Sequence, residues 1–343
     1  MTTTGDQDAR AGLDGADTGT DIGTGDAAGP VDADLAGTDT GTGDAAGPVD
    51  ADLAGLDPDG PDAASATGYD PGFLAVGVPL PDTGGRVVRE LPYAHFTVLL
   101  DPARRLAALT VVNVDGDSLI DLERGDDWHL DERVPADEQC GPEVYARNDL
   151  DRGHLVRRRD PVWGSPAVAS RANRDTFSYT NAAPQAADFN QSAELWLGLE
   201  DQVLQYAQVH RQRLTVFTGP VLLDDDAPYR GVRIPRSFFK IAAWATGGGA
   251  ALRTAGYLLD QGPELDGVDL EAAFARAHEA GDPPPLGEYR TFQVPVRDIA
   301  ALTGLEIAQL AEADSLQTVP TVQPPEGLRP GWVPLTSVDQ LTF

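Results

Sequence analysis

The sequence has little of several residue types, and each shortage excludes a class of protein. Among 343 residues there is one cysteine, Cys140, and one lysine, Lys240. A single cysteine cannot form an intramolecular disulfide, and it argues against a structural zinc site built on cysteines. No reactive-thiol motif surrounds Cys140, so we expect a small buried hydrophobe. The five histidines are dispersed without HxH or HExxH spacing, which argues against a metal held by paired histidines.

A long apolar run is also missing. No stretch of about 18 or more apolar residues occurs, so we expect no membrane span. The first residues, MTTTGDQDARAGLDG, have neither an apolar core nor an early basic residue, so we expect no Sec-type signal peptide. The default expectation is a cytoplasmic protein, and export by a route without such a signal stays open.

Positive charge is scarce. The formal net charge is −30 and the isoelectric point is about 4.2, which favours solubility and disfavours nonspecific attraction to nucleic acid. The charge is unevenly distributed, because residues 1–62 contain fifteen aspartates and one arginine, a net of −14. The rest of the chain therefore repels a phosphate ligand less strongly than the total net charge of −30 suggests.

The first 66 residues consist mostly of Gly, Ala, Asp and Thr, and the segment GTGDAAGPVDADLAG at 23–37 returns at 41–55. Such a segment cannot bury enough apolar surface to offset its ordering entropy. We therefore predict a disordered acidic tail over 1–66 and one folded domain over 67–343. The composition also suggests calcium-binding repeats, but the glycine-rich nonapeptide pattern is absent, so a solvated linker is the favoured interpretation.

From residue 69 onward the pattern is typical of a globular domain. Apolar, β-branched runs bounded by turn residues predict strands at 95–101, 107–115, 213–223, 231–245 and 252–260. Helical spacing or composition predicts helices at 186–209, 269–280 and 296–313, and 116–150 is loop-rich. Because strands and helices do not alternate regularly, we predict an α+β fold, with a mostly antiparallel sheet core and flanking helices.

The most basic window of the chain runs from Arg147 to Arg174, with seven arginines and three aspartates. It contains His154, which follows a glycine and lies two residues after Arg152 and three before Arg157. A histidine titrates near neutral pH and can accept a proton from water, and arginines bind phosphate. The competing interpretation is a structural histidine among arginines that form a solvated face or pair with aspartates.

A second stretch, TFSYTNAAPQAADFNQ at 176–191, carries two asparagines, Asn181 and Asn190. An amide oxygen is a hard, neutral ligand suited to Mg²⁺, and a lone protein ligand leaves the ion its waters and its full charge. A helix N-cap is the alternative role for Asn190.

The two stretches together resemble the DNA/RNA non-specific endonuclease family, which includes the Serratia-type nuclease and mitochondrial endonuclease G. The motifs that carry the resemblance are DRGH at 151–154, TNAAPQ at 180–185, FNQ at 189–191, WLGLED at 196–201, TGPVL at 218–222 and IPRSFFKI at 234–241. The resemblance spans roughly residues 69–343. It implies a ββα-metal core, in which a β-hairpin and a helix hold one divalent cation, Mg²⁺ or Mn²⁺.

The resemblance also implies roles for single residues. His154 matches the general base, Arg152 matches an arginine that contacts phosphate, and Asn190 matches the sole direct protein ligand of the metal. Asn181 matches a supporting polar residue, and Glu200 matches a glutamate that reaches the metal through water. From the basic window we add Arg157 and Arg158 as further candidates for the substrate phosphate.

One departure from the family pattern concerns the glutamate. Glu200 lies ten positions after Asn190 here, whereas the corresponding spacing in the family is usually eight. Ten residues of helix rise about 15 Å and turn by about 280°, so Glu200 would not lie in the family's position unless two residues loop out. Glu194, one turn after Asn190, is the substitute candidate. One turn after Glu200 stands Leu204, where some members carry a basic residue, so the grip on phosphate is expected to be weaker here.

These features predict a metal-dependent endonuclease that hydrolyses phosphodiester bonds of DNA and/or RNA with little sequence specificity. The alternative is a catalytically weak nucleic-acid-binding protein on the same fold. The sequence leaves the oligomeric state open, so a homodimer stays a candidate. An indiscriminate nuclease in the cytoplasm would need an inhibitor protein, a trigger or prompt export.

Deleting residues 1–66 tests the predicted tail. If the tail is only a solvated linker, the truncated protein should keep its cleavage rate on DNA and RNA within about two-fold, because the segment adds no apolar contact to the domain. The measurement compares the initial cleavage rates of full-length and truncated protein. A large loss of activity would place part of the working site in the tail.

Overall fold

The computed structural model describes residues 68–123, 125–186, 204–205, 207–249, 251–263, 267–287, 290–318 and 329–336. The predicted tail lies outside the described residues, and so do Asn190, Glu194 and Glu200. No helix among the described residues is long and apolar enough to cross a membrane.

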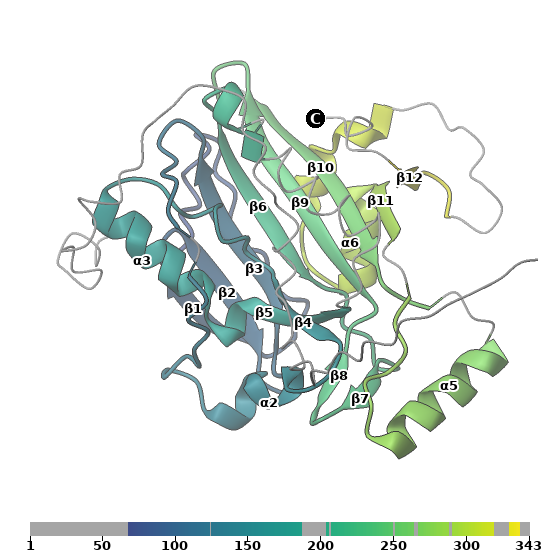
Figure 1. Ribbon diagram of the computed structural model, residues 1–343. Helices are drawn as coiled ribbons and strands as arrows, with labels where there is room; N and C mark the ends of the chain where they lie inside the picture. Colours follow the sequence, from purple (N-terminus) through teal and green to yellow (C-terminus); the bar gives the residue numbers. More distant parts are fainter. Residues whose placement is uncertain are drawn as a thin grey trace, which may run out of the picture.

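An eight-stranded antiparallel sheet forms the centre of the described structure (Figure 1). Neighbouring strands follow the order β1-β2-β3-β6-β9-β10-β11-β12. Their bounds are Arg89–Tyr93, Phe96–Asp101, Leu106–Asp115, Arg213–Pro220, Ser237–Thr246, Ala251–Asp260, Arg290–Val294 and Val333–Leu335, in the same order. The predicted α+β class with a mostly antiparallel sheet is therefore confirmed.

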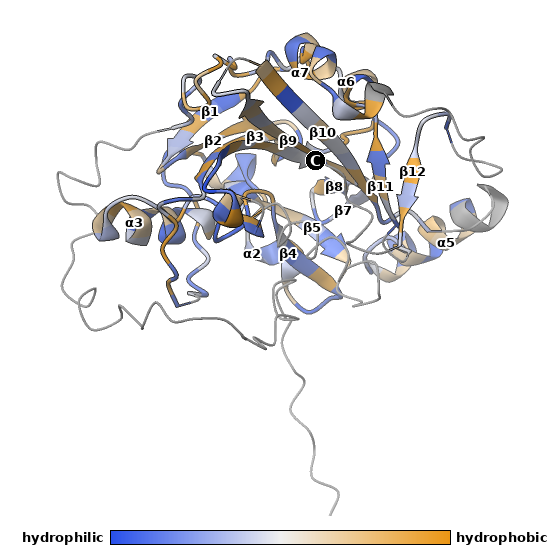
Figure 2. Cartoon of the chain, turned by 90° about the horizontal axis from the view of Figure 1, so that it is seen from above, coloured by the Kyte–Doolittle hydropathy of each residue, from blue (hydrophilic) through white to orange (hydrophobic). Residues whose placement is uncertain are grey.

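The central strands are apolar on both faces, and this explains the layers. Every residue of β3 is buried, so neither face of this strand contacts solvent. One apolar cluster, which we call the back cluster, packs on one face together with α6 (Val296–Thr303) and α7 (Ala308–Glu312). The other, the site-face cluster, packs against the elements that carry DRGH and TNAAPQ. Figure 2 shows these two sets of elements on opposite sides of the sheet.

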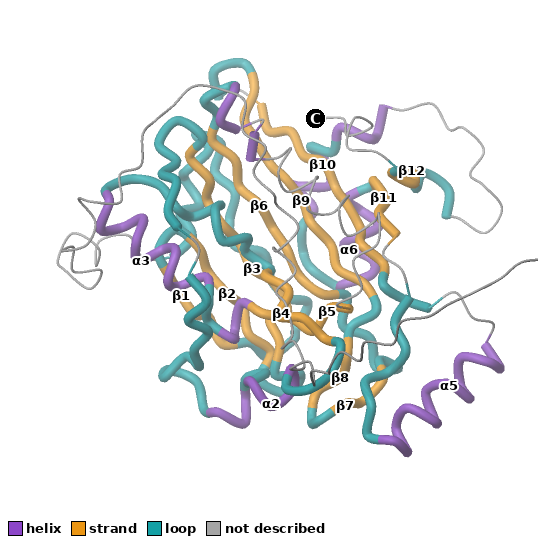
Figure 3. Tube along the Cα trace, in the orientation of Figure 1, coloured by secondary structure: helices purple, strands orange, loops and turns teal. Residues whose placement is uncertain are grey.

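The elements on the site face are short. They are η3 (Ala136–Glu138), α2 (Pro142–Tyr145), β4 (Leu150–His154), α3 (Pro166–Thr176), η4 (Tyr179–Asn181) and β5 (Ala182–Ala186). Strands β4 and β5 form a separate two-stranded antiparallel ribbon (Figure 3), and β5 packs against β3. A second ribbon pairs β7 (Ala227–Tyr229) with β8 (Val232–Ile234). The remaining elements are α5 (Gly267–Ala280) and η5 (Ser315–Thr318).

A polar band crosses the apolar site face at the middle of the sheet. The cross-strand register places five buried residues side by side on consecutive strands, Thr110, Thr218, Lys240, Tyr257 and Gln293. Buried polar groups need polar surroundings, because desolvation without a hydrogen bond costs free energy. The only lysine of the sequence is thus an interior residue of the sheet.

Two predicted elements are each divided in two. The predicted strand 231–245 is β8 followed by β9, because Pro235 lacks the N–H that would continue the ladder. The predicted helix 296–313 is α6 followed by α7, because Gly304 ends α6 in the left-handed conformation with φ 74°. Helix α3 was missed, although Ser165 caps its first turn and Pro166 begins it. Of the predicted helix 186–209, residues 187–203 lie outside the described part.

A buried ion pair joins two turns at one end of the sheet. The carboxylate of Asp226, which is fully buried, accepts a hydrogen bond from Arg104 Nη2 at 2.6 Å and one from the backbone N–H of Leu223 at 2.9 Å. This contact ties the turn before β7 to the turn between β2 and β3. Removing one partner of such a pair leaves an uncompensated charge inside the protein.

We expect Asp226→Ala to lower the free energy of unfolding by about 3 kcal/mol, because Arg104 would remain buried without its carboxylate. Urea unfolding measures this loss. The matched control is the neighbouring Asp225→Ala, which removes an exposed carboxylate 2.6 Å from Arg236 and should cost much less. Equal losses for the two variants would contradict the assignment.

Candidate functional site

The β4–β5 ribbon places Arg152 and His154 on one side of β4. The two residues are separated by one position, so their side chains leave the same face of the strand. Between them, Gly153 pairs with Ala183 across the ribbon. A Cβ atom on Gly153 would overlap the side chain of Gln185, so a larger residue at this position of DRGH would force Gln185 to move.

The side chain of Asn181 makes hydrogen bonds to the backbone next to β4. Its Oδ1 accepts from the N–H of Val156 at 2.9 Å, and its Nδ2 donates to the carbonyl of Val156 at 2.9 Å and to that of Thr176 at 3.0 Å. Its own carbonyl accepts from the N–H of Leu155 at 2.9 Å. Asn181 is fully buried, and these bonds hold the chain that follows His154.

Aromatic rings surround His154. The imidazole lies 4.6 Å from the ring centroid of Trp128, with the planes at 51°, and meets Phe177 edge-on at 5.2 Å. The guanidinium carbon of Arg152 lies over the Trp128 ring at 5.3 Å from its centroid. The structure therefore brings His154 and Arg152 together on one indole. Trp128 was not among the residues predicted from the sequence, where it stands as a single tryptophan inside the acidic loop segment DDWHLD.

The arginines that follow His154 are less available than predicted. Arg157 is 6% exposed, so its burial argues against the predicted contact with a substrate phosphate. Arg158 donates from Nη1 to the carbonyl of Leu122 at 2.9 Å and bridges to Asn173 Oδ1 at 3.5 Å. Through Nη1, Arg158 therefore connects the loop before Trp128 to α3.

Aspartates of the same loop lie near the remaining arginines. Asp126 Oδ1 is 3.7 Å from Arg152 Nη2, and Asp121 Oδ1 is 3.9 Å from Arg159 Nη2. The two carboxylates are largely exposed, with 69% and 84% of their side-chain surface accessible. Arg152 of the predicted phosphate site and the nearby Arg159 thus each have an exposed anionic neighbour, and we call these two carboxylates, Asp121 and Asp126, the acidic rim.

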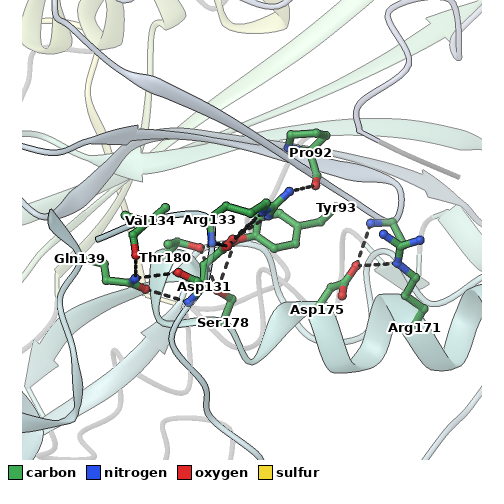
Figure 4. A network of polar contacts seen from close by, with 11 residues as sticks. Pro92, Tyr93, Asp131, Arg133, Val134, Gln139, Arg171, Asp175, Ser178 and Thr180 are labelled. Atoms are coloured by element: carbon green, nitrogen blue, oxygen red, sulfur yellow. Dashed lines mark hydrogen bonds and ion pairs between the residues drawn. The ribbon is translucent and has the colours of Figure 1, made fainter. Parts of the chain in front are cut away.

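A buried polar network fixes the loop that carries Trp128 (Figure 4). Tyr93 donates its hydroxyl hydrogen to Asp131, and Arg133 Nη2 donates to the same carboxylate oxygen at 2.6 Å. The Tyr93 oxygen also lies 2.6 Å from Thr180 Oγ1 and 3.2 Å from Ser178 Oγ, on the segment that leads to Asn181. The network therefore connects edge strand β1, the Trp128 loop and η4.

The charge state of the network follows from its contacts. Burial by itself raises the pKa of Asp131, but hydrogen bonds from Arg133 and Tyr93 outweigh burial and hold this pKa below its ordinary value. Burial, together with the neighbouring Asp131 charge, raises the pKa of Tyr93. Tyr93 therefore stays protonated and donates, while Asp131 stays ionised and accepts.

The expected metal ligand Asn190 and the carboxylates Glu194 and Glu200 lie outside the described residues. Within the described part of the chain, no group of three or more His, Cys, Asp or Glu residues is placed to hold a metal ion.

Leu204 is buried in the site-face cluster. Cys140 is also buried there, and burial raises the pKa of its thiol to about 12, as expected for a small hydrophobe.

Comparisons with known proteins show which family the chain belongs to. A curated protein named y4fB and described as uncharacterized, from Sinorhizobium fredii (strain NBRC 101917 / NGR234), is 38% identical over 290 residues. The match covers 75% of this chain and 43% of that protein, so the chain spans less than half of its relative. The crystal structure of the EndoG/EndoGI complex is similar over 69% of this chain and 93% of that one, at 18% identity and a TM-score of 0.49. The family described as DNA/RNA non-specific endonuclease matches residues 77–314, more than half of the chain. The chain therefore belongs to the DNA/RNA non-specific endonuclease family.

Proposed function

We propose that the protein is a metal-dependent endonuclease that hydrolyses phosphodiester bonds of DNA and/or RNA with little sequence specificity. The observation that carries the proposal is the shared face of β4, on which Arg152 and His154 both contact one indole ring. A phosphate held by the arginine would lie beside a proton acceptor, which is the pairing that hydrolysis of a phosphodiester requires. Family membership supports the same reaction class.

In the proposed reaction, neutral His154 accepts a proton from water as the water attacks phosphorus in line. Arg152 forms charge-assisted hydrogen bonds to the phosphate and stabilises the charge that develops on it. The amide oxygen of Asn190 would hold one Mg²⁺ or Mn²⁺ per site, with Glu200 or Glu194 reaching it through water. The bound ion would act as a Lewis acid for the leaving 3′ oxygen. The products are 5′-phosphate and 3′-hydroxyl ends.

Low sequence specificity follows from the groups in the site. Arg152 and His154 address the phosphate, and contacts to the backbone of nucleic acid carry no sequence information. DNA and RNA both present this phosphodiester, so the proposal extends to both. A homodimer and an inhibitor protein stay predictions from the sequence.

The second candidate, a nucleic-acid-binding protein with little catalytic power, has one observation in its favour. The acidic rim and the burial of Arg157 leave fewer cations for a phosphate than the sequence predicts. Incubating a supercoiled plasmid with the protein, in Mg²⁺ and in EDTA, separates the two functions. Nicking that requires Mg²⁺ supports the endonuclease, and retarded but intact plasmid supports the binder.

His154→Ala should lower the cleavage rate by about 10²- to 10⁴-fold, because the reaction loses its general base. Initial rates on plasmid DNA and on RNA, with Mg²⁺ and with Mn²⁺, measure the loss. His278→Ala, on the exposed side of α5, is the matched control and should leave the rate unchanged.

The corresponding test of the metal ligand is Asn190→Ala, which should abolish the dependence of the rate on Mg²⁺ concentration together with most of the activity. Full activity of His154→Ala would show that another group is the base. A normal Mg²⁺ dependence of Asn190→Ala would return this residue to the role of a helix cap.

Neutralising the acidic rim should strengthen the binding of nucleic acid, whereas the two preceding substitutions should reduce activity. Asp126→Asn should lower the KM for DNA by about two- to five-fold, because an exposed carboxylate no longer competes with phosphate for Arg152. The control Asp127→Asn changes the net charge equally at the adjacent exposed position. The difference between the two variants should shrink when the salt concentration rises from 50 to about 300 mM. Identical effects of both variants would mean that only net charge matters.

A further inference from the structure

The ring of Trp128 contacts both Arg152 and His154. One part of the indole meets the imidazole at 4.6 Å between centroids, and the guanidinium carbon of Arg152 lies over the same ring at 5.3 Å. The ring is only partly buried, at the edge of the site-face cluster. The indole therefore forms one surface that contacts the side chains of both Arg152 and His154.

The indole is supported from the protein side. Phe177 meets it edge-on at 5.4 Å, and Tyr179 packs against it at 5.6 Å with the planes at 42°. Phe177 also touches the imidazole edge-on. Trp128 and Phe177 thus contact the imidazole of His154, and Tyr179 supports the indole from the protein side. Close packing of this kind restricts the rotamers of the side chains that it contacts.

The backbone of the tryptophan loop is tied to the same segment. The N–H of His129 donates to the carbonyl of Phe177 at 3.1 Å, and the N–H of Tyr179 donates to the carbonyl of His129 at 2.9 Å. His129 and Ser178 form an isolated parallel bridge. Asn181 on the same segment holds the chain after His154. The segment 177–181 therefore connects the tryptophan loop to the strand that carries His154.

The Asp131 network holds the other end of this loop. The carboxylate binds Tyr93 and Arg133, and Gln139 Nε2 donates to the carbonyls of Asp131 and Val134 at 2.9 and 2.8 Å. The loop that carries Trp128 is therefore fixed on both sides of the tryptophan.

We propose that Trp128 is a positioning residue of the nuclease site. A cation–π contact holds the guanidinium of Arg152 over the indole, and the same ring limits the rotation of the His154 imidazole. This inference rests on the proposed function, since it assigns Trp128 a role through the two side chains that act on the phosphodiester.

The physical reason lies in the freedom of an arginine side chain. An ordered arginine gives up a large rotamer entropy, and an aromatic face beneath its planar guanidinium lowers that cost before the substrate arrives. The exposed carboxylate of Asp126 lies 3.7 Å from Arg152 Nη2 and attracts the same guanidinium. In the proposed role, the contact with the indole favours the position of Arg152 beside His154 over a closer approach to Asp126.

The role predicts a ranked series of variants at position 128. Trp128→Phe keeps an aromatic face and should retain the cleavage rate within about three-fold, whereas Trp128→Leu keeps apolar volume but removes the cation–π contact and should lower kcat by about 3- to 30-fold. The matched control is Trp332→Leu, which removes another tryptophan beneath an arginine, Arg329 at 5.6 Å, outside the site. This control should leave kcat unchanged.

A double-mutant cycle with Arg152→Ala separates positioning from general destabilisation. If Trp128 acts through Arg152, Trp128→Leu should cost at least about three-fold less in the Arg152→Ala background than in the wild type, because the contact is already lost. Equal costs in both backgrounds would overturn the proposal. So would a Trp128→Leu variant that raises only KM, because misplaced catalytic groups reduce kcat.

A second readout does not require activity. The imidazole C–H resonances of His154, identified by their absence from the NMR spectrum of His154→Ala, should shift in Trp128→Leu and stay in place in Trp332→Leu. An unshifted His154 signal in Trp128→Leu would overturn the proposal. A wild type that cleaves no nucleic acid with any divalent metal would end the proposed function, and the NMR comparison would still decide whether Trp128 contacts His154 in solution.

Discussion

The site depends first on the carboxamide of Asn181. Its oxygen and nitrogen bond to the N–H and the carbonyl of Val156, so two segments that lie far apart in the chain are joined directly behind His154. Side chains alternate along a strand, so a one-residue slip in the β4–β5 ribbon would turn His154 and Arg152 toward the opposite face. A buried amide with all of these bonds satisfied in only one register makes such a slip costly. The buried contact between Asn181 and Val156 thus helps to decide on which face of β4 the side chains of Arg152 and His154 lie.

The rest of the structure makes that ribbon rigid. The central strands are buried on both faces, so the β4–β5 ribbon packs on a sheet that is itself packed from behind by α6 and α7. The network of Tyr93, Asp131 and Thr180 adds a polar connection from the sheet edge to the segment before β5. Side chains carried on such packed elements lose less entropy when a ligand binds, because their geometry exists beforehand.

The charge of the chain is unevenly distributed. Nearly half of the net charge belongs to residues 1–62, and near the predicted site the acidic rim lies beside Arg152 and Arg159. Exposed carboxylates interact weakly and are screened by salt, whereas an aromatic ring beneath a guanidinium restricts its motion. Under the proposed function, the local geometry around Arg152 would therefore matter more for recognition of phosphate than the total charge does.

Local sequence was sufficient for features that depend on neighbours in the chain. The apolar runs at 107–115 and 252–260 predicted β3 and β10, and the spacing of DRGH and TNAAPQ pointed to the two segments that pair as β4 and β5. The sequence by itself determined the fold class and the family, because both follow from patterns along the chain. Only the tertiary structure decided that Trp128 lies beneath Arg152 and His154, that Arg157 is buried, and that Asn181 bonds to the backbone. These contacts join residues more than twenty positions apart, and no local pattern specifies which side chains meet once a sheet and its covering loops have packed.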